Sequence, residues 1–252
     1  MGIVIRKVVA MSEVMIRPTE ICAHHRPEGC ARCKVRLISV CSVLNPSDLA
    51  ELETMNRPRR FSARDVIVSE SETAENVFSI TEGMVRIYRM LPDGRRHVLG
   101  FGLPGDFLGL SLLSMFEFTA DAVTDVSVCQ FPRKTFADFV DRTPYFLKRS
   151  HEFATNELRL AQHQLVVLGR KSADERVSAF IVMLRDRMRG AGFSSVTLPL
   201  PMNRQDIADY LGLTIETVSR SITRLAKDKV ILVVPGGVRL LRADRLEQLA
   251  AA

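Results

Sequence analysis

Short runs of β-branched and aromatic residues, partly alternating with polar ones, recur between residues 61 and 133. Turn-forming residues separate the runs, and the Pro92-Asp93-Gly94 segment has the composition of a hairpin turn. Several strands at this spacing, with glycine-rich connections, predict a β-domain of the jelly-roll type. The apolar runs cover residues 65–70, 76–83, 84–90, 96–101 and 122–131.

A different periodicity follows, in which apolar residues recur at alternating steps of four and three. Thr143 and Pro144 supply a cap and a proline at the first position of a long helix. The apolar stripe is narrow, which favours packing against the same helix of a second copy in a homodimer. Packing of the stripe on the chain's own β-domain is the alternative. The expected seam consists of Leu147, His151, Ala154, Leu158, Ala161, Leu165 and Leu168.

A capping box from Ser172 to Glu175 predicts the start of another helix, and therefore of a second domain near residue 170. The apolar face of this helix is expected to be Val177, Phe180, Ile181, Leu184 and Met188. The patterns divide the chain into a cysteine-rich segment (1–45), a β-roll domain (46–142), a long helix (143–170) and a C-terminal domain (171–252).

The segment from residue 203 to residue 229 has the pattern of two short helices joined by a tight turn. Asn203 is placed to cap the first helix, Gly212 to make the turn and Thr214 to cap the second helix. Two apolar runs around Pro235-Gly236-Gly237 follow and predict a β-hairpin, the wing of a winged helix-turn-helix. A plain helical hairpin is the alternative. The buried face of the second helix is expected to be Ile215, Val218, Ile222 and Leu225.

The opposite face of that second helix carries side chains suited to reading DNA bases. Arg220 can bind guanine with two hydrogen bonds, Glu216 can accept one from cytosine, and Ser219 can serve either kind of edge. All three lie in the first half of the helix, as recognition helices require. We expect nearby residues to contact phosphates and position the helix, namely Arg204, Thr223, Arg224 and Lys227.

Composition agrees with a polyanionic partner. The 252 residues carry a net charge of +6, and the segment from residue 171 onward has 13 basic against 9 acidic residues. A hydrophobic content of 46% and a charged content of 25% exclude a disordered chain, a collagen-like fibre and a coiled-coil rod. The sequence contains no secretion signal, spanning segment or catalytic motif that we recognise, so a cytoplasmic protein that is not an enzyme is expected.

The five cysteines are unevenly distributed. Four fall between Cys22 and Cys41, three of them in a C-x2-C-x7-C pattern, and the fifth is Cys129 on an expected strand. Three local thiols and one distant thiol suit an iron–sulfur cluster. A tetrahedral zinc site that also draws on Cys22, His24 or His25 is an alternative, as are a dithiol switch and, for Cys129, an ordinary core thiol.

The stretch DIADYLGLTIETVSR, residues 206–220, resembles the DNA-binding motif of the Crp/Fnr superfamily of bacterial regulators, in particular its Fnr-type branch with E-x-x-S-R on the recognition helix. The resemblance covers nearly the whole chain. It implies an α+β fold: an N-terminal cyclic-nucleotide-binding-like β-roll, a long dimerisation helix and a C-terminal winged helix-turn-helix. It also implies a homodimer on a palindrome with TTGAT-like half-sites, base recognition by Glu216, Ser219 and Arg220, and contact with RNA polymerase.

The same resemblance bears on the effector. Fnr-type regulators hold an oxygen-labile [4Fe-4S] cluster, and the carry-over makes Cys30, Cys33, Cys41 and Cys129 its ligands, with Cys22 extra. Many relatives bind cyclic nucleotides instead, but Phe118 stands where they place the arginine that binds the phosphate. A buried phosphate without a cation is costly, so no cyclic nucleotide is expected. A regulator without a cluster, controlled by its synthesis or by thiol oxidation, and a metal-binding signalling module whose winged helix contacts proteins are the competing hypotheses.

Overall fold

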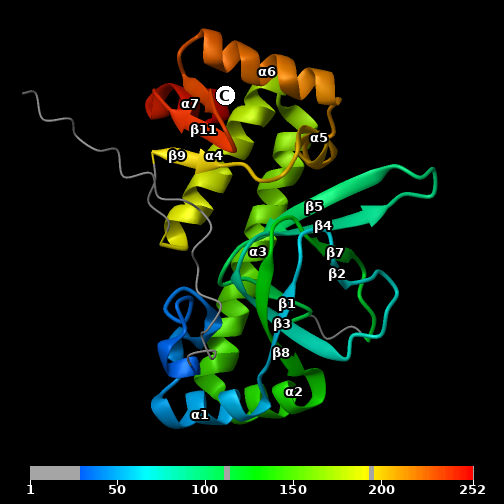
Figure 1. The fold of residues 1–252 in the computed structure, drawn as a ribbon, viewed down its shortest axis with the longest axis vertical. Coiled ribbons are helices and arrows are strands. Elements are labelled where there is room, and N and C mark those ends of the chain that lie inside the picture. The colour runs from blue at the N-terminus through cyan, green and yellow to red at the C-terminus, as the bar shows by residue number, and fades with distance from the viewer. Residues whose placement is uncertain (1–28, 111–113, 193–195, 252) are drawn as a thin grey trace, which may run out of the picture.

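A computed structural model describes residues 29–110, 114–192 and 196–251. Helix α3 (Pro144–Arg170) runs along the long axis of the molecule (Figure 1). The N-terminal helices lie beside its first part, and the C-terminal domain lies around its last part (Figure 1). The predicted α+β architecture is confirmed. Predictions that involve residues 1–28, among them Cys22, His24 and His25, lie outside the described residues.

The β-domain consists of two four-stranded antiparallel sheets, with strand orders β1-β8-β3-β6 and β2-β7-β4-β5. Side chains from both sheets, such as Ile80 and Val85, fill the space between them. The predicted hairpin turn is confirmed, since Gly94 donates a backbone hydrogen bond to Leu91 between β4 and β5. The strands are β1 (Arg57–Phe61), β2 (Val66–Val68), β3 (Asn76–Glu82), β4 (Val85–Met90), β5 (Arg96–Gly102), β6 (Phe107–Leu108), β7 (Thr119–Ala122) and β8 (Val126–Pro132).

Helical segments flank the β-domain on the side of its N-terminus. They are the 3-10 turns η1 (Cys30–Arg32) and η2 (Val40–Val43) and the helices α1 (Pro46–Met55) and α2 (Arg133–Arg142). Aromatic side chains of α2, β8 and α3 pack together here, with Phe131, Phe136 and Phe146 almost fully buried. This packing attaches the first part of α3 to the β-domain.

Most of the predicted seam on α3 is exposed in the single chain. The exposed fraction is 59% for Leu158 and 70% for Leu165, whereas Val167, on another face of the helix, is buried. Leu147, His151, Ala154 and Ala161 are exposed as well, and Leu168 is half-buried. The stripe therefore does not pack on the chain's own β-domain.

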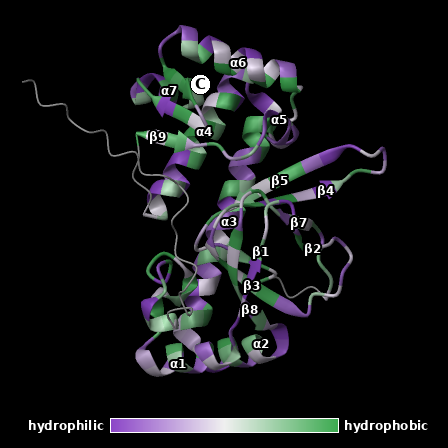
Figure 2. Ribbon diagram, in the orientation of Figure 1, coloured by the Kyte–Doolittle hydropathy of each residue, from purple (hydrophilic) through white to green (hydrophobic). Residues whose placement is uncertain are grey.

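The C-terminal domain begins at α4 (Ala173–Gly190), where the Glu175 carboxylate accepts a hydrogen bond from the Ser172 backbone N–H at 2.8 Å. The predicted capping box and wing are confirmed. Figure 2 shows hydrophobic and hydrophilic residues alternating along α6, the helix that carries the expected DNA-reading face. The remaining elements are β9 (Thr197–Pro199), α5 (Arg204–Leu211), α6 (Ile215–Lys227), β10 (Ile231–Val234), β11 (Gly237–Leu240) and α7 (Ala243–Ala251).

Candidate nucleic-acid interface and cysteine site

The turn between α5 and α6 has the backbone that its sequence predicts. The Asn203 side chain accepts a hydrogen bond from the Asp206 N–H, and the Thr214 hydroxyl accepts one from the Thr217 N–H. Gly212 ends α5 with a φ of +61°. This left-handed conformation is readily available only to glycine, so Gly212 directs the chain from α5 into α6.

Helix α6 has one buried face and one exposed face. Val218, Ile222 and Leu225 are buried, while Glu216, Ser219 and Arg220 are exposed. The expectation for Ile215 was wrong: this side chain is 38% exposed, because it lies in the first turn, at the edge of the domain. The helix thus presents one carboxylate, one hydroxyl and one guanidinium to a ligand outside the domain.

Contacts within the first turns of α6 orient these polar groups. The Arg220 guanidinium donates a hydrogen bond to the Thr217 hydroxyl at 3.2 Å. Backbone hydrogen bonding at Glu216 and the hydroxyl of Thr214 lower the pKa of the Glu216 carboxyl. Glu216 is therefore ionised at neutral pH and can act only as an acceptor, as pairing with the amino group of cytosine requires.

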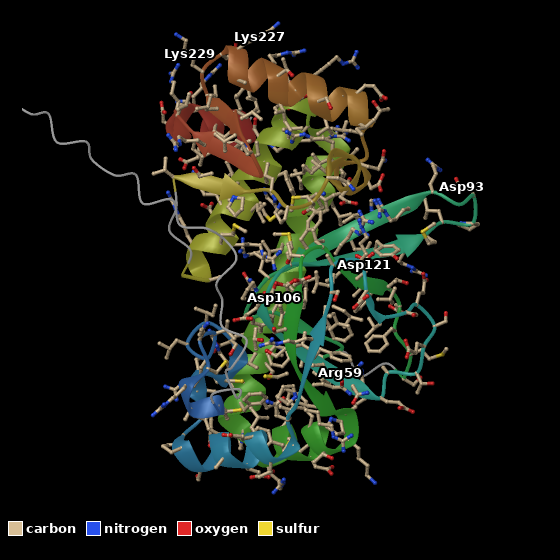
Figure 3. The ribbon with its side chains drawn as sticks, in the orientation of Figure 1. Arg59, Asp93, Asp106, Asp121, Lys227 and Lys229 are labelled. Carbon is tan, nitrogen blue, oxygen red and sulfur yellow. The ribbon has the colours of Figure 1, made fainter. Side chains whose placement is uncertain are left out.

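The expected phosphate-contacting residues occupy different environments. Lys227 is exposed and points away from the body at one end of α6 (Figure 3), and Thr223 is exposed on the same helix. Arg224 forms an ion pair with Asp174 of α4 at 2.5 Å. Arg204 is half-buried at the start of α5, and burial lowers its pKa.

The four cysteines that the resemblance implicates converge between the N-terminal turns and the β-domain. Cys30 is in η1, Cys33 follows directly after η1, and Cys41 is in η2. Cys129 lies on β8, where it is paired with Pro58 of β1 and Ser79 of β3. All four cysteines have free thiols and are partly buried. The fold therefore brings a residue of the central sheet next to three residues of the N-terminal segment.

Burial and the nearby cysteines raise the pKa values of the Cys30, Cys41 and Cys129 thiols. Burial, then the charge of Glu53 and that of Cys33, raise the pKa of Cys30 to about 11. Burial is also the main cause at Cys129, where the other three cysteines add to it and bring the pKa to about 12. Without a bound metal the Cys30, Cys41 and Cys129 thiols are protonated at neutral pH, so their binding to a metal centre releases protons.

Three neighbours of the cysteines were not foreseen from the sequence. The Glu53 carboxylate accepts a hydrogen bond from the Cys30 N–H, and the Ser39 hydroxyl accepts one from the Cys41 N–H. The Asn56 side chain interacts with Cys129 and lowers the pKa of its thiol. Asn, Ser and Glu side chains of this kind carry no spacing signal, so only the fold identifies them.

A zinc ion and an iron–sulfur cluster require different spacings of the sulfur atoms that bind them. Over the ranges that the structure describes, no three His, Cys, Asp or Glu side chains are placed to hold one metal ion. Tetrahedral zinc needs its sulfur ligands about 3.8 Å apart, given a zinc–sulfur bond of about 2.3 Å. A cubane cluster is larger, because each thiolate binds a different iron atom. Cys129 is close enough to the other three described cysteines to interact with them electrostatically.

Phe118, which stands where the resemblance expects a phosphate-binding arginine, contacts another aromatic side chain. Phe118 packs edge-on against Phe116, with 5.8 Å between the ring centroids, and Phe116 belongs to the core between the two sheets. Asp106, the carboxylate retained beside Gly105, is bound by Arg187 of α4. Phe118 and Asp106 are thus both engaged by other side chains of the chain.

Two family models match the chain. Residues 58–143 match the cyclic nucleotide-binding domain, and residues 175–249 match the Crp-like helix-turn-helix domain. A β-roll joined in this way to an exposed recognition helix defines a DNA-binding transcription regulator.

Similar proteins place the chain within this class. It is 47% identical to the transcriptional activatory protein AadR of Rhodopseudomonas palustris, over 93% of this chain and 98% of that protein. It is 44% identical to the nitrogen fixation regulation protein FixK of Bradyrhizobium diazoefficiens, over 94% of this chain and all of that protein. The crystal structure of FixK2 from Bradyrhizobium japonicum superposes with a TM-score of 0.73 at 33% identity, covering 78% of this chain and 98% of that one.

The chain belongs to the Crp/Fnr family of transcription regulators, and its features are of the Fnr type. The relatives are transcription regulators and not enzymes, in agreement with the expectation from the sequence. Among the described residues, no helix has the length and hydrophobicity that crossing a membrane requires.

Proposed function

We propose that this protein is a homodimeric transcription activator that binds a palindrome with TTGAT-like half-sites and is controlled by an oxygen-labile [4Fe-4S] cluster. Cys30, Cys33, Cys41 and Cys129 are its ligands, and the protein acts in the cytoplasm. The observation that carries the proposal is the convergence of these four thiols from two distant parts of the sequence.

The donor set fits this cofactor. Four thiolates from one pocket are the ligand set that a cubane cluster takes, and hydrogen bonds to the ligand sulfurs tune such clusters. When bound, the cluster makes the protein responsive to oxygen, because oxygen degrades the cluster. Because Cys129 is anchored between β1 and β3, the other three ligands tie the N-terminal segment to the β-domain whenever all four are engaged.

The homodimer is supported by the exposed seam on α3. Leu158 and Leu165 present apolar surface that the single chain leaves in water, at the heptad spacing of a two-stranded interface. A second copy related by a twofold axis would bury these residues. It would also place two recognition helices on the two halves of a palindrome.

Recognition of the half-sites is assigned to Glu216, Ser219 and Arg220, with phosphate contacts from Arg204, Thr223, Arg224 and Lys227. Activation is proposed because the relatives AadR and FixK are described as an activatory and a regulation protein. Activators of this class contact RNA polymerase, which we propose as the second macromolecular partner.

Iron and sulfide analysis of anaerobically purified protein tests the cofactor. We expect four iron and four sulfide per chain, with a broad visible absorbance that air bleaches. Cys129→Ser should abolish the absorbance, while Cys22→Ser, the matched control, should retain it. A colourless protein with one zinc per chain, or one with no metal, contradicts the proposal. Loss of the cluster in Cys22→Ser but not in Cys30→Ser would overturn the ligand set.

A further inference from the structure

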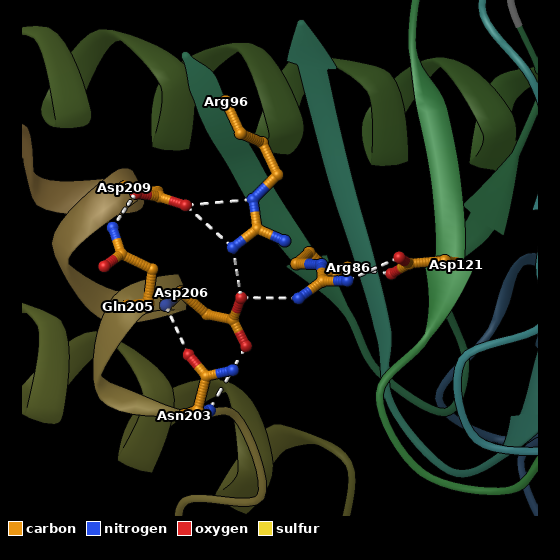
Figure 4. A network of polar contacts seen from close by, with 7 residues as sticks. All are labelled: Arg86, Arg96, Asp121, Asn203, Gln205, Asp206 and Asp209. Atoms are coloured by element: carbon orange, nitrogen blue, oxygen red, sulfur yellow. Dashed lines mark hydrogen bonds and ion pairs between the residues drawn. The ribbon is translucent and has the colours of Figure 1, made fainter. Parts of the chain in front are cut away.

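The first helix of the DNA-binding domain, α5, is ion-paired to the β4–β5 hairpin of the sensor domain (Figure 4). Arg96 of β5 donates two hydrogen bonds to the Asp209 carboxylate, at 2.9 and 2.7 Å, and one to Asp206 at 2.6 Å. Arg86 of β4 donates to the same oxygen of Asp206. The two arginines and two aspartates are more than 100 residues apart in the sequence.

The network is largely shielded from water. The exposed fraction of the side chain is 3% for Asp206, 13% for Asp209 and 22% for Arg96. Asp121 of β7 holds the other side of the Arg86 guanidinium, and the Tyr88 ring lies 5.6 Å from the guanidinium carbon of Arg96. Ion pairs with so little exposure have defined geometry, unlike the mobile pairs of a protein surface.

Asp206 also belongs to the local structure of α5. Its second carboxylate oxygen accepts a hydrogen bond from the Asn203 N–H, which closes the cap at the start of the helix. The arginines therefore bind a group that is itself fixed to the first turn of α5. Because α5 continues through the Gly212 turn into α6, the network connects the recognition helix to the β-domain.

Apolar and polar contacts accompany the network at the same junction. Phe101 of β5 packs against Phe180 of α4 and Tyr210 of α5, with ring centroids 6.0 and 5.8 Å apart. Arg187 of α4 pairs with Asp106 and donates to the Phe101 carbonyl. The two domains thus share a continuous core. The ion pairs have a defined geometry, so they restrict the relative orientation of the domains more than apolar packing alone would.

We infer that Arg86 and Arg96 are positioning residues for DNA recognition: they hold each helix-turn-helix in the orientation at which both recognition helices of the dimer fit one palindrome. The inference rests on the proposed function. Half-sites of a palindrome are centred about 34 Å apart on one face of the DNA, so both helices engage only when each is held at a fixed angle. Loss of the network would leave each recognition helix able to bind one half-site. It would remove the additional affinity that the dimer gains when both helices bind the palindrome together.

The test compares two duplexes, one with the full TTGAT-like palindrome and one with a single half-site, using full-length anaerobically purified protein. We expect Arg96→Gln to weaken binding to the palindrome by about tenfold, a typical coupling between distant sites, and to leave half-site binding unchanged. Asp209→Asn should act in the same way. Arg95→Gln removes the same charge from the exposed end of the same hairpin, where Arg95 pairs only locally with Asp93, and should bind both duplexes like the original protein.

A charge exchange distinguishes positioning from general destabilisation. Arg96→Asp combined with Asp209→Arg restores an ion pair at the junction but loses the pair with Asp206, so it should recover part of the binding to the palindrome. Unchanged palindrome binding in Arg96→Gln, an equal loss on both duplexes, or no recovery in the exchanged pair would overturn the inference. If the original protein itself does not prefer the palindrome to the half-site, the proposed function fails instead.

Discussion

Arg224 on the exposed side of α6 forms an ion pair with Asp174 near the start of α4, with 2.5 Å between a guanidinium nitrogen and a carboxylate oxygen. The residue proposed to bind a DNA phosphate is therefore already engaged by an acidic side chain of the same domain. Binding of DNA must exchange one anionic partner of Arg224 for another.

This exchange predicts an unusual gain of function. Asp174→Asn should raise DNA affinity by about two- to fivefold, because the variant removes the carboxylate that competes with the phosphate for Arg224. An exposed ion pair of this kind contributes up to about 1 kcal/mol. Arg224→Gln should instead weaken binding and lower the salt slope by about one unit. Fluorescence anisotropy over a series of salt concentrations measures both. Weaker binding by Asp174→Asn would show that the ion pair helps to present Arg224.

Base recognition and phosphate contact can be separated on α6. Arg220→Lys should cost about 1–3 kcal/mol at the guanine of the half-site and relax the preference there, because lysine cannot form the paired hydrogen bonds. Lys227→Gln, the control, should weaken binding to all sequences alike. Competition with duplexes carrying each base at that position measures the difference. An equal loss of affinity for all of these duplexes in Arg220→Lys would show that Arg220 does not contact the bases.

The α3 seam predicts the assembly state. Leu165→Glu should produce monomers, since two carboxylates would face each other in an apolar interface. Val166→Glu provides a matched control, because Val166 is a neighbouring exposed apolar residue that lies off the heptad seam. Sedimentation equilibrium measures the mass of each variant. Dimers in Leu165→Glu, or monomers in Val166→Glu, would place the interface elsewhere.

Close packing at the wing gives a prediction for stability. A Cβ atom at Gly237 would lie 2.2 Å from the backbone oxygen of Leu198, so β9 would have to move. Gly237→Ala should therefore lower the free energy of unfolding by about 1–3 kcal/mol. Gly190→Ala, at a helix end with open space around it, should leave stability unchanged or raise it. Urea denaturation compares the two variants.

The sequence predicted the elements whose signals are local. The caps at Ser172, Asn203 and Thr214 and the hairpin turn at Gly94 all follow from neighbouring residues, and the structure has each of them. The exposure of Leu165 likewise agrees with the apolar stripe, which is too narrow for a helix buried in the core.

Contacts between distant segments could not be predicted in this way. Arg86 and Asp206 each look like ordinary charged residues of a strand and a helix, and no spacing connects them. The same holds for Asn56 beside Cys129. Ile215 was misplaced because helical periodicity assigns a face but cannot tell how far the domain surface extends over the first turn.

Binding of the palindromic duplex before and after exposure of one anaerobic sample to air tests the central claim most directly. Fluorescence anisotropy should show affinity falling by about tenfold or more as the visible absorbance bleaches. Cys129→Ser should have the weaker affinity from the outset. Equal affinity before and after air exposure, in a sample that has lost its iron and sulfide, would contradict control of DNA binding by the cluster.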